Sequence, residues 1–184
     1  PRTNKPYLYF ETIGGGMGAR ATKDGKDGVQ VGITNTSNLP VESIEQESPL
    51  RVEEYGFVED SGGAGQFRGG MGLRRVLTPV DHECVFNGAG ERFRYQPWGL
   101  FGGEAGGSGR FMLEDADGTR RLADKPNEVE VKLGTKITVE TPGAGGYGKP
   151  SDRAPEAVER DKNSGKFSTD YINKNYSTNG TGGQ

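Results

Sequence analysis

Two short segments of this 184-residue chain bring together side chains that could bind an anion or move a proton. In the first, Glu42 and Glu45 are three residues apart, so their carboxylates share one face if the segment is helical. Asn35 lies just before them, in a stretch dense in hydrogen-bonding groups. In the second, Arg68 lies between glycine pairs, where its guanidinium group could hold a carboxylate or a phosphate. The simpler interpretations are a capped, solvated helix and an arginine that braces a loop against the two glutamates.

Two glycine clusters resemble nucleotide-binding loops. Gly14, Gly15 and Gly16 begin a match to the G-x-G-x-x-[GA] pattern, but that pattern needs a helix at the glycines, and the residues that follow have no apolar periodicity. Residues 143–149 match a phosphate-binding loop, but Pro150 stands where a serine or threonine hydroxyl is needed. We therefore predict a shaped loop near a site or interface for the first cluster and a strand-to-turn exit for the second.

The chain has few residues for metal binding or nucleophilic catalysis. Its one histidine, His82, and its one cysteine, Cys84, cannot form a zinc site by themselves. Cys84 has apolar neighbours, which favours a small buried residue, and Ser61 beside two glycines is typical of a turn. We expect this chain alone to bind no metal or cofactor. A single cysteine also excludes an internal disulfide and fits a reducing compartment, so we expect a cytoplasmic protein.

The composition predicts a thin side-chain core. Only 30% of the residues are hydrophobic and 32 are glycine, which buries almost no side-chain area. Each glycine also costs roughly 0.5–1 kcal/mol more conformational entropy than alanine in a regular element. We infer that another chain or segment stabilises the fold by covering part of its surface. A net charge of -3 with scattered basic residues predicts no nucleic-acid partner, and no apolar run is long enough for a membrane span.

Short β-strands are predicted for most of the chain, because runs of β-branched and aromatic residues are bounded by glycine, proline or aspartate. The predicted strands are residues 7–12, 29–34, 50–59, 72–79, 83–87, 110–114, 119–122, 128–133 and 136–140. Helices are predicted at residues 40–46, with Asn38 as a cap, and at residues 152–161. The pattern is typical of a mainly β, glycine-rich sandwich or barrel-like domain with one or two short helices. We expect residues 1–170 to form this region and residues 171–184 a disordered tail.

Several sequence blocks, most of them rich in glycine, follow one another in a fixed order over about residues 7–170. They are residues 11–19, 34–45, 60–70, 97–103, 141–148 and 152–165. Together and in this order, the blocks resemble the carboxy-terminal half of the hydantoinase B/5-oxoprolinase family. The chain departs from the family pattern at Ala144, where glycine is usual, at Lys149, where aspartate is usual, and in its last residues.

The resemblance implies one part of a two-component enzyme. In that family ATP with Mg²⁺ is held by a hydantoinase A-type subunit, which phosphorylates the substrate, and the B-type subunit helps to hydrolyse a cyclic amide. The implied partners are the A-type subunit, the remaining amino-terminal part of the B-type subunit, where any divalent metal is expected, and a small-molecule substrate. The chain itself is then an incomplete piece, which we expect to be inactive alone, and no catalytic residue is assigned to it. The residues expected to face a substrate or an interface are Gly14, Gly15, Gly16, Asn35, Glu42, Glu45 and Arg68.

Two alternatives remain open. The same scaffold serves ATP-dependent ketone carboxylases of the acetone and acetophenone type, and these residues do not separate the two reactions. The chain could also be a non-catalytic, β-rich assembly module that only docks its neighbours.

Overall fold

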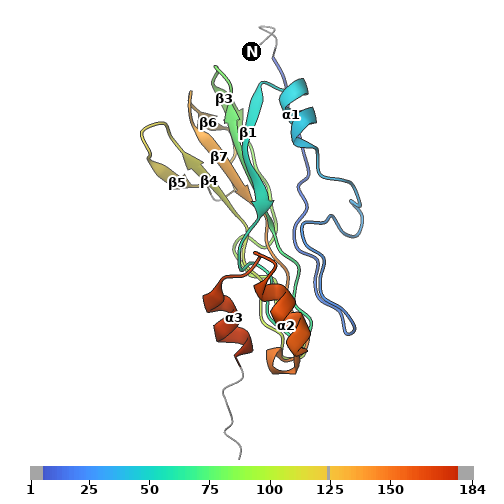
Figure 1. Ribbon diagram of the computed structural model, residues 1–184. Helices are drawn as coiled ribbons and strands as arrows, with labels where there is room; N and C mark the ends of the chain where they lie inside the picture. The colour runs from blue at the N-terminus through green and yellow to red at the C-terminus, as the bar shows by residue number, and fades with distance from the viewer. Residues whose placement is uncertain (1–5, 124, 178–184) are drawn as a thin grey trace, which may run out of the picture.

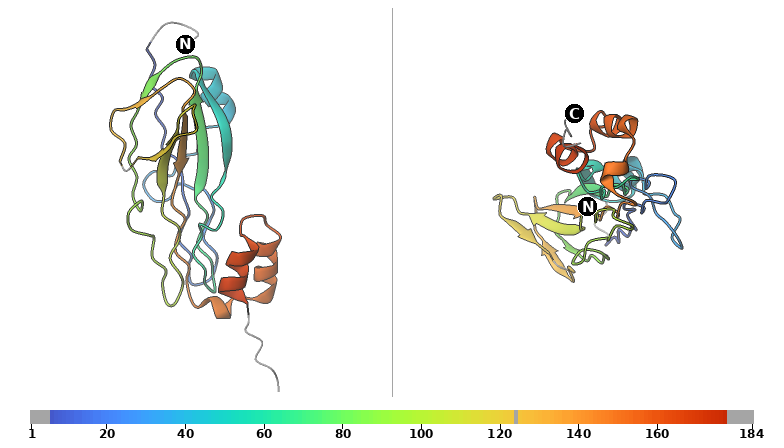
Figure 2. Two further views of the ribbon diagram at one scale, coloured as in Figure 1. Left: turned by 90° about the vertical axis from the view of Figure 1, so that its left-hand side faces the viewer. Right: turned by 90° about the horizontal axis from the view of Figure 1, so that it is seen from below.

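The fold is elongated, with β-sheets toward one end and a pair of helices at the other (Figure 1 and Figure 2). The computed structural model describes residues 6–123 and 125–177. Its helices are α1 (Val41–Glu47), α2 (Pro155–Lys162), α3 (Thr169–Tyr176) and the short 3-10 helix η1 (Pro150–Asp152). Its strands are β1 (Leu50–Phe57), β2 (Leu73–Pro79), β3 (Cys84–Phe86), β4 (Arg110–Glu114), β5 (Arg120–Leu122), β6 (Val129–Val131) and β7 (Lys136–Glu140). No helix of the described ranges is long and apolar enough to cross a membrane.

Five strands form an antiparallel sheet in the order β1-β2-β7-β4-β5. Alternating apolar residues explain the pairing of β4 with β7, because Leu113 lies opposite Ile137 and Phe111 lies opposite Val139 on one face. The predicted bounds of these two strands are confirmed, and the bounds of five further predicted strands differ by one or two residues at an end. The two predicted helices are also present, as α1 and α2.

Two separate layers cover one face of this sheet. α1 and the chain at Tyr7 pack on β1 and β2 around Ile44 and Leu77. The two-stranded sheet of β3 and β6 packs on β4 and β7 around Leu113 and Val131. The mainly β class is therefore confirmed, with a sandwich over part of the sheet. The barrel-like alternative is wrong because the sheets do not close, and the described chain has three α-helices rather than one or two.

Toward α2 and α3, glycine-rich segments lie side by side and exchange backbone hydrogen bonds. We define the glycine bundle as residues 14–28, 61–72, 97–107 and 141–148. The N–H of Gly143 donates to the carbonyl oxygen of Gly107 (3.0 Å). The next residue, Ala144, donates to the carbonyl of Gly70 (3.0 Å) and accepts from the N–H of Gly63 (2.8 Å). The carbonyl of Pro142 also accepts from the N–H of Gly16 (3.0 Å), so residues 141–148 bond to three other segments, whereas a strand in a sheet bonds to at most two neighbours.

The segments of the glycine bundle approach one another too closely for a side chain. A Cβ atom on Gly69 would lie 1.8 Å from the carbonyl oxygen of Ala144, and one on Gly16 would lie 2.1 Å from that of Gly70. Both distances are far inside van der Waals contact, and the neighbouring atoms are backbone that cannot turn away. Glycine at these positions permits the hydrogen bonds between segments, where the sequence had led us to expect loops.

Two predicted strands, residues 7–12 and 29–34, belong to no sheet. Residues 7–12 run past α1 without a strand partner in the described chain, and residues 29–34 contain a turn at Gly32 (Figure 1). Val29 makes a single isolated bridge, to Gly15. The prediction was wrong because residue alternation favours an extended chain, whereas a strand also needs a partner edge.

The carboxy-terminal helix α3 starts before the predicted end of the folded region at residue 170. Ser168 caps it by accepting a hydrogen bond from the N–H of Tyr171, and its residue Ile172 packs against Met71 of the glycine bundle. Residues 171–176 are thus helical, and residues 178–184, the rest of the expected tail, lie outside the described residues.

Candidate functional site

The residues predicted to face a substrate or partner lie at two ends of the molecule. Glu42 and Glu45 belong to α1, at the sheet end (Figure 1). Arg68 bonds to Asp161 of α2, at the opposite end. The structure therefore does not bring these side chains into one site, and Arg68 does not brace its loop against the two glutamates.

The α1 end presents polar groups to solvent. Glu42 is exposed, and Glu45 accepts a hydrogen bond from the N–H of Val52 in β1 (2.9 Å). Asn35 is exposed and has a left-handed backbone with φ +36°. Asn38 does not cap the helix as predicted, since Pro40 occupies the cap position without a side-chain bond. Glu42 and Asn35 are free to contact a ligand, while Glu45 also holds α1 to the sheet.

Asn38 instead joins the polar loop to the glycine bundle. Its side-chain oxygen accepts from the N–H of Gly14 (2.7 Å) and its side-chain nitrogen donates to the carbonyl of Gly28 (3.1 Å). The N–H of Gly15 donates to Val29 (3.3 Å) and that of Gly16 to Pro142 (3.0 Å). The first glycine cluster is therefore part of the bundle rather than an open loop.

The second glycine cluster also offers no cradle for a phosphate group. The N–H groups of Gly143 and Gly146 donate to the carbonyls of Gly107 and Glu104, both at 3.0 Å. Lys149 precedes the 3-10 helix η1 rather than opening an α-helix. The residues present do not fit ATP at either cluster, because the donors that would bind its phosphates are already bonded to the backbone.

Arg68 lies in a buried cluster of charged side chains. Its Nη1 donates to Oδ1 of Asp27 (2.8 Å) and to the carbonyl of Gly69 (3.0 Å), and its Nε donates to Oδ1 of Asp161 (3.1 Å). The guanidinium also lies over the ring of Phe167, 5.4 Å from its centroid. Its Nη2 also donates to Asp27 (3.3 Å), so four of the five N–H donors of Arg68 have partners. This arginine therefore holds α2 to the bundle.

A second arginine, Arg153, completes the cluster. Its Nη2 lies 2.8 Å from Oδ2 of Asp161, and its Nη1 lies 2.8 Å from Oδ1 of Asp24. Lys166 pairs with Asp27 at 2.6 Å. We define the acid–base cluster as Asp24, Asp27, Arg68, Arg153, Asp161 and Lys166. Its three cations balance its three carboxylates, so it has no excess charge with which to attract an ionic substrate.

The electrostatics of the cluster follow from burial and pairing. Burial alone would raise the pKa of Asp27, but hydrogen bonds from Arg68 and Lys166 outweigh it and lower that pKa below its usual value. The same balance, with Arg153 as donor, lowers the pKa of Asp24. For Arg68, burial disfavours the charge, but the bond to Asp27 raises its pKa above the ordinary value. Asp24, Asp27 and Arg68 are therefore ionised near neutral pH.

A second buried ion pair joins the chain near the amino end to the sheet. Arg75, which is 0% exposed, pairs with Glu11, and its Nη2 donates to the carbonyl of Leu39 (3.2 Å). The guanidinium also lies over the ring of Tyr55, 4.2 Å from its centroid. The sequence gives no local signal for this pair or for the partners of Arg68, because their members are far apart in the chain.

The candidate nucleophiles have structural roles. Ser61 donates to the carbonyl of Val58 (2.7 Å) and accepts from the N–H of Gly72 (2.9 Å), which confirms the predicted turn. His82 bonds to the hydroxyl of Tyr7 (2.7 Å) and to the carbonyl of Val80 (2.8 Å). Cys84 is the first residue of β3 and is partly buried, and burial raises the pKa of its thiol. Within the described ranges, no three His, Cys, Asp or Glu side chains group to hold a metal ion.

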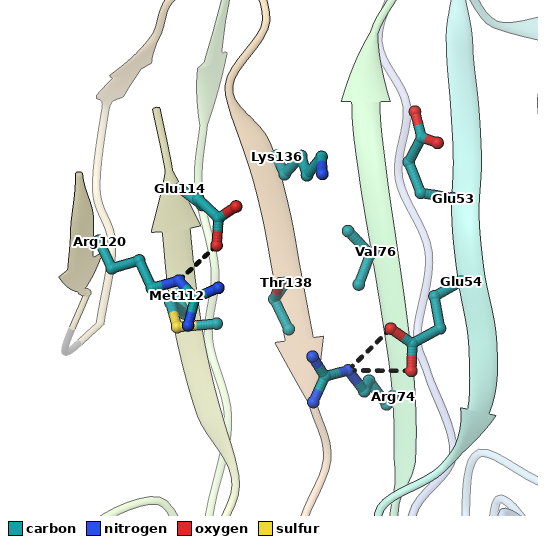
Figure 3. A pocket seen from close by; sticks show the side chains of 9 residues that line it. All are labelled: Glu53, Glu54, Arg74, Val76, Met112, Glu114, Arg120, Lys136 and Thr138. Atoms are coloured by element: carbon teal, nitrogen blue, oxygen red, sulfur yellow. Dashed lines mark hydrogen bonds and ion pairs between the residues drawn. The ribbon is translucent and has the colours of Figure 1, made fainter. Parts of the chain in front are cut away.

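The uncovered face of the large sheet has a shallow hollow of about 380 Å³ (Figure 3). Arg74 pairs there with Glu54 (3.1 Å), and Glu114 pairs with Arg120. Its lining residues are Glu53, Glu54, Arg74, Val76, Met112, Glu114, Arg120, Lys136 and Thr138. Six of these nine are charged, whereas small-molecule sites are mostly apolar, so the hollow is a charged sheet face rather than a ligand pocket.

Comparisons with known proteins agree on one family. The family model described as hydantoinase B/oxoprolinase matches residues 1–150. An uncharacterised protein of Methanocaldococcus jannaschii is 38% identical over 170 residues, covering 92% of this chain and 30% of the relative. The B-type subunit of a putative D-/L-hydantoinase from a Pseudomonas species is 34% identical over 165 residues, covering 87% of this chain and 27% of the relative.

A solved structure shows the same fold. The crystal structure of the ATP-dependent caprolactamase from Pseudomonas jessenii superposes with a TM-score of 0.75 and 27% identity, covering 93% of this chain and 31% of that chain. The chain thus spans about three tenths of the length of each of these three proteins.

Proposed function

Because the chain belongs to the hydantoinase B/oxoprolinase family, we propose that it is one region of a B-type subunit in an ATP-dependent enzyme that hydrolyses cyclic amides. The observation that carries the proposal is the family match over residues 1–150, together with 34% identity to the B-type subunit of a putative D-/L-hydantoinase. The resemblance in fold to an ATP-dependent caprolactamase supports the same reaction class.

Within that subunit we assign this region a scaffolding role. The acid–base cluster is neutral and internally bonded, and the glycine bundle uses its N–H groups between its own segments. Both features position backbone rigidly and leave few free donors for a substrate. Of the residues predicted to face a substrate, Asn35 and Glu42 are the ones that remain exposed and unengaged, so they are the candidates for contact with a substrate or partner.

The energy for ring opening comes from a partner in this proposal. ATP with Mg²⁺ would be held by an A-type subunit, which would phosphorylate the amide oxygen and so activate the carbonyl carbon. One water would then add to that carbon, the ring C–N bond would break with the nitrogen leaving as the amine, and a second water would release phosphate, so that ATP hydrolysis drives an otherwise unfavourable ring opening. Any divalent metal is held by another part of the B-type subunit. A reducing compartment such as the cytoplasm suits the single cysteine of the chain.

Turnover by the complete complex tests this function. The B-type subunit carrying this sequence is purified with its A-type partner and offered hydantoin, 5-oxoproline or caprolactam. We expect release of ADP in step with ring opening of one of these substrates, and neither without ATP. Bicarbonate-dependent ATP use with a ketone would instead establish the carboxylase alternative, and a complete complex without any ATP turnover would leave only the docking module.

The exposed residues of the α1 end need a separate test. Asn35→Ala and Glu42→Ala are compared with Glu47→Ala, an exposed carboxylate at the end of the same helix. If the first two side chains contact substrate, kcat/KM falls by about tenfold or more, as for loss of about 1.4 kcal/mol of transition-state binding. Values equal to that of Glu47→Ala would show that this end faces no substrate.

A further inference from the structure

Residues 7–12 have the side-chain pattern of a β-strand without a strand partner. Tyr7, Tyr9 and Glu11 point toward the molecule, where they bond to His82 and Arg75. Between them, Leu8 and Phe10 point outward and are 89% and 82% exposed. Single exposed apolar residues are ordinary on a protein surface. Here two large ones alternate along the chain with inner side chains that are bonded to the rest of the molecule.

The backbone of the same residues has unused hydrogen-bonding groups. Among the described residues, no N–H between Tyr7 and Ile13 has an acceptor, and the carbonyl of Thr12 is the one that accepts, from the side chain of Gln30. An extended chain with open N–H and C=O groups is a template for an added strand. The inner side chains fix this template in position, because Glu11 pairs with buried Arg75 and accepts from the N–H of Leu39 (2.9 Å).

The apolar surface continues beyond these residues. Gly15 and Val29 form an antiparallel bridge, which brings the two segments side by side, and the second segment then presents Val31 (49% exposed) and Ile33 (104% exposed). By contrast, the uncovered face of the large sheet is lined mainly by charged residues. Both amino-terminal segments therefore expose large apolar side chains, as the glycine bundle also does at Trp98, Leu100 and Phe101.

We propose that residues 7–12 receive an added β-strand from the remaining part of the B-type polypeptide, which covers Leu8 and Phe10. This inference rests on the proposed function. The added strand is assigned to this polypeptide because the relatives are more than three times as long as the region that matches this chain. A B-type polypeptide of that length contains a large part besides the matched region. The low apolar content and many glycines of the chain agree with stabilisation by such a neighbour.

The test measures how well each position is covered in the full-length B-type subunit. In a Cys84→Ser background, Leu8→Cys and Phe10→Cys are compared with Leu122→Cys, which replaces a leucine that is 74% exposed at the far edge of the sheet. We expect a maleimide reagent to label Cys at position 8 or 10 at least tenfold more slowly than at position 122. A ratio near one would overturn the proposal, because nothing then covers the outward face.

Amide hydrogen exchange separates strand addition from simple coverage. In the same full-length subunit, every second amide of residues 8–12 should exchange as slowly as those of β2, since a strand added at one edge bonds to alternate N–H groups. Slow labelling with fast amide exchange would overturn strand addition. The failure of the proposed function is distinguishable, because protection at these residues without turnover of cyclic amides removes the hydrolase and keeps the interface.

Discussion

The sheet and the glycine bundle are stabilised in different ways within one chain. The sheet has regular ladders and two apolar clusters, around Leu77 and around Leu113. The bundle has almost no regular secondary structure, and its segments are joined by backbone hydrogen bonds at 2.7–3.2 Å and by the buried acid–base cluster. Packing of apolar side chains stabilises the sheet. The bundle is stabilised by backbone hydrogen bonds, which can form because glycine has no side chain to keep the segments apart.

This difference explains how a chain with 30% hydrophobic residues can fold over most of its length. A small core is sufficient for the sheet end, because the other end needs little apolar side-chain area. The apolar contact of the bundle is the one where α3 packs against Met71. Substitutions should therefore have opposite rules in the two regions: adding a methyl group harms the bundle, and removing volume harms the sheet.

The largest effect is expected from adding one methyl group inside the bundle. Gly69→Ala or Gly16→Ala places a Cβ about 2 Å from a backbone oxygen, so segments must separate and lose several hydrogen bonds. We expect a loss of about 4 kcal/mol or more, or no folded protein, measured by urea unfolding. Gly18→Ala is the matched control, since a Cβ there meets no atom within 4 Å, and it should change stability by less than about 0.5 kcal/mol. Equal stability of all three variants would show that the segments are not in contact.

A slightly smaller effect is expected from breaking the acid–base cluster. Arg68→Met leaves Asp27 and Asp161 buried with too few partners, which costs about 3–5 kcal/mol. Arg120→Met removes an exposed ion pair with Glu114 and should cost less than about 1 kcal/mol. If thermal or urea unfolding shows equal losses for the two variants, the cluster does not hold α2 to the bundle.

The sheet should respond to lost volume. Leu113 of β4 is 0% exposed and packs against β6 and β7. Leu113→Ala should lower the free energy of unfolding by about 2–5 kcal/mol, because apolar burial is lost and a cavity remains. Leu122→Ala, at a side chain that is 74% exposed, should cost less than about 0.5 kcal/mol. The comparison between the regions would be wrong if Leu113→Ala were tolerated as well as its control.

The smallest effect is a dependence of stability on pH that belongs to the bundle. The folded-state pKa values of Asp24 and Asp27 lie below the unfolded value, so their contribution to stability is complete above about pH 4 and is lost as the pH falls through the lower folded values. Urea unfolding between pH 7 and pH 3 should show this loss in the parent chain. The variant Asp24→Asn with Asp27→Asn should lose less stability over that interval, and an unchanged slope would assign the acid sensitivity to other groups.

How far the sequence predicts the structure also differs between the two regions. Alternating residues placed β4 and β7 with correct bounds, because sheet pairing follows from a local period of two. The same reasoning placed a strand at residues 7–12, where no described partner exists. Glycine clusters carry no periodic pattern, so their segments were expected to be loops, and no local feature connects Arg68 with Asp161. A signal for α3 was present in Ser168, Thr169 and Asp170, which form a typical helix start.

Amide hydrogen exchange measures whether backbone hydrogen bonds hold the segments of the glycine bundle together. The N–H groups of Gly70, Ala144 and Gly146 lie outside every helix and strand, yet each donates to a carbonyl of another segment at 2.9–3.0 Å. The account predicts that these amides exchange as slowly as those of Val76 in β2 and Ile137 in β7, at least about a thousandfold more slowly than in an unfolded chain. Exchange at the rate of exposed loops, with β2 and β7 still protected, would contradict it.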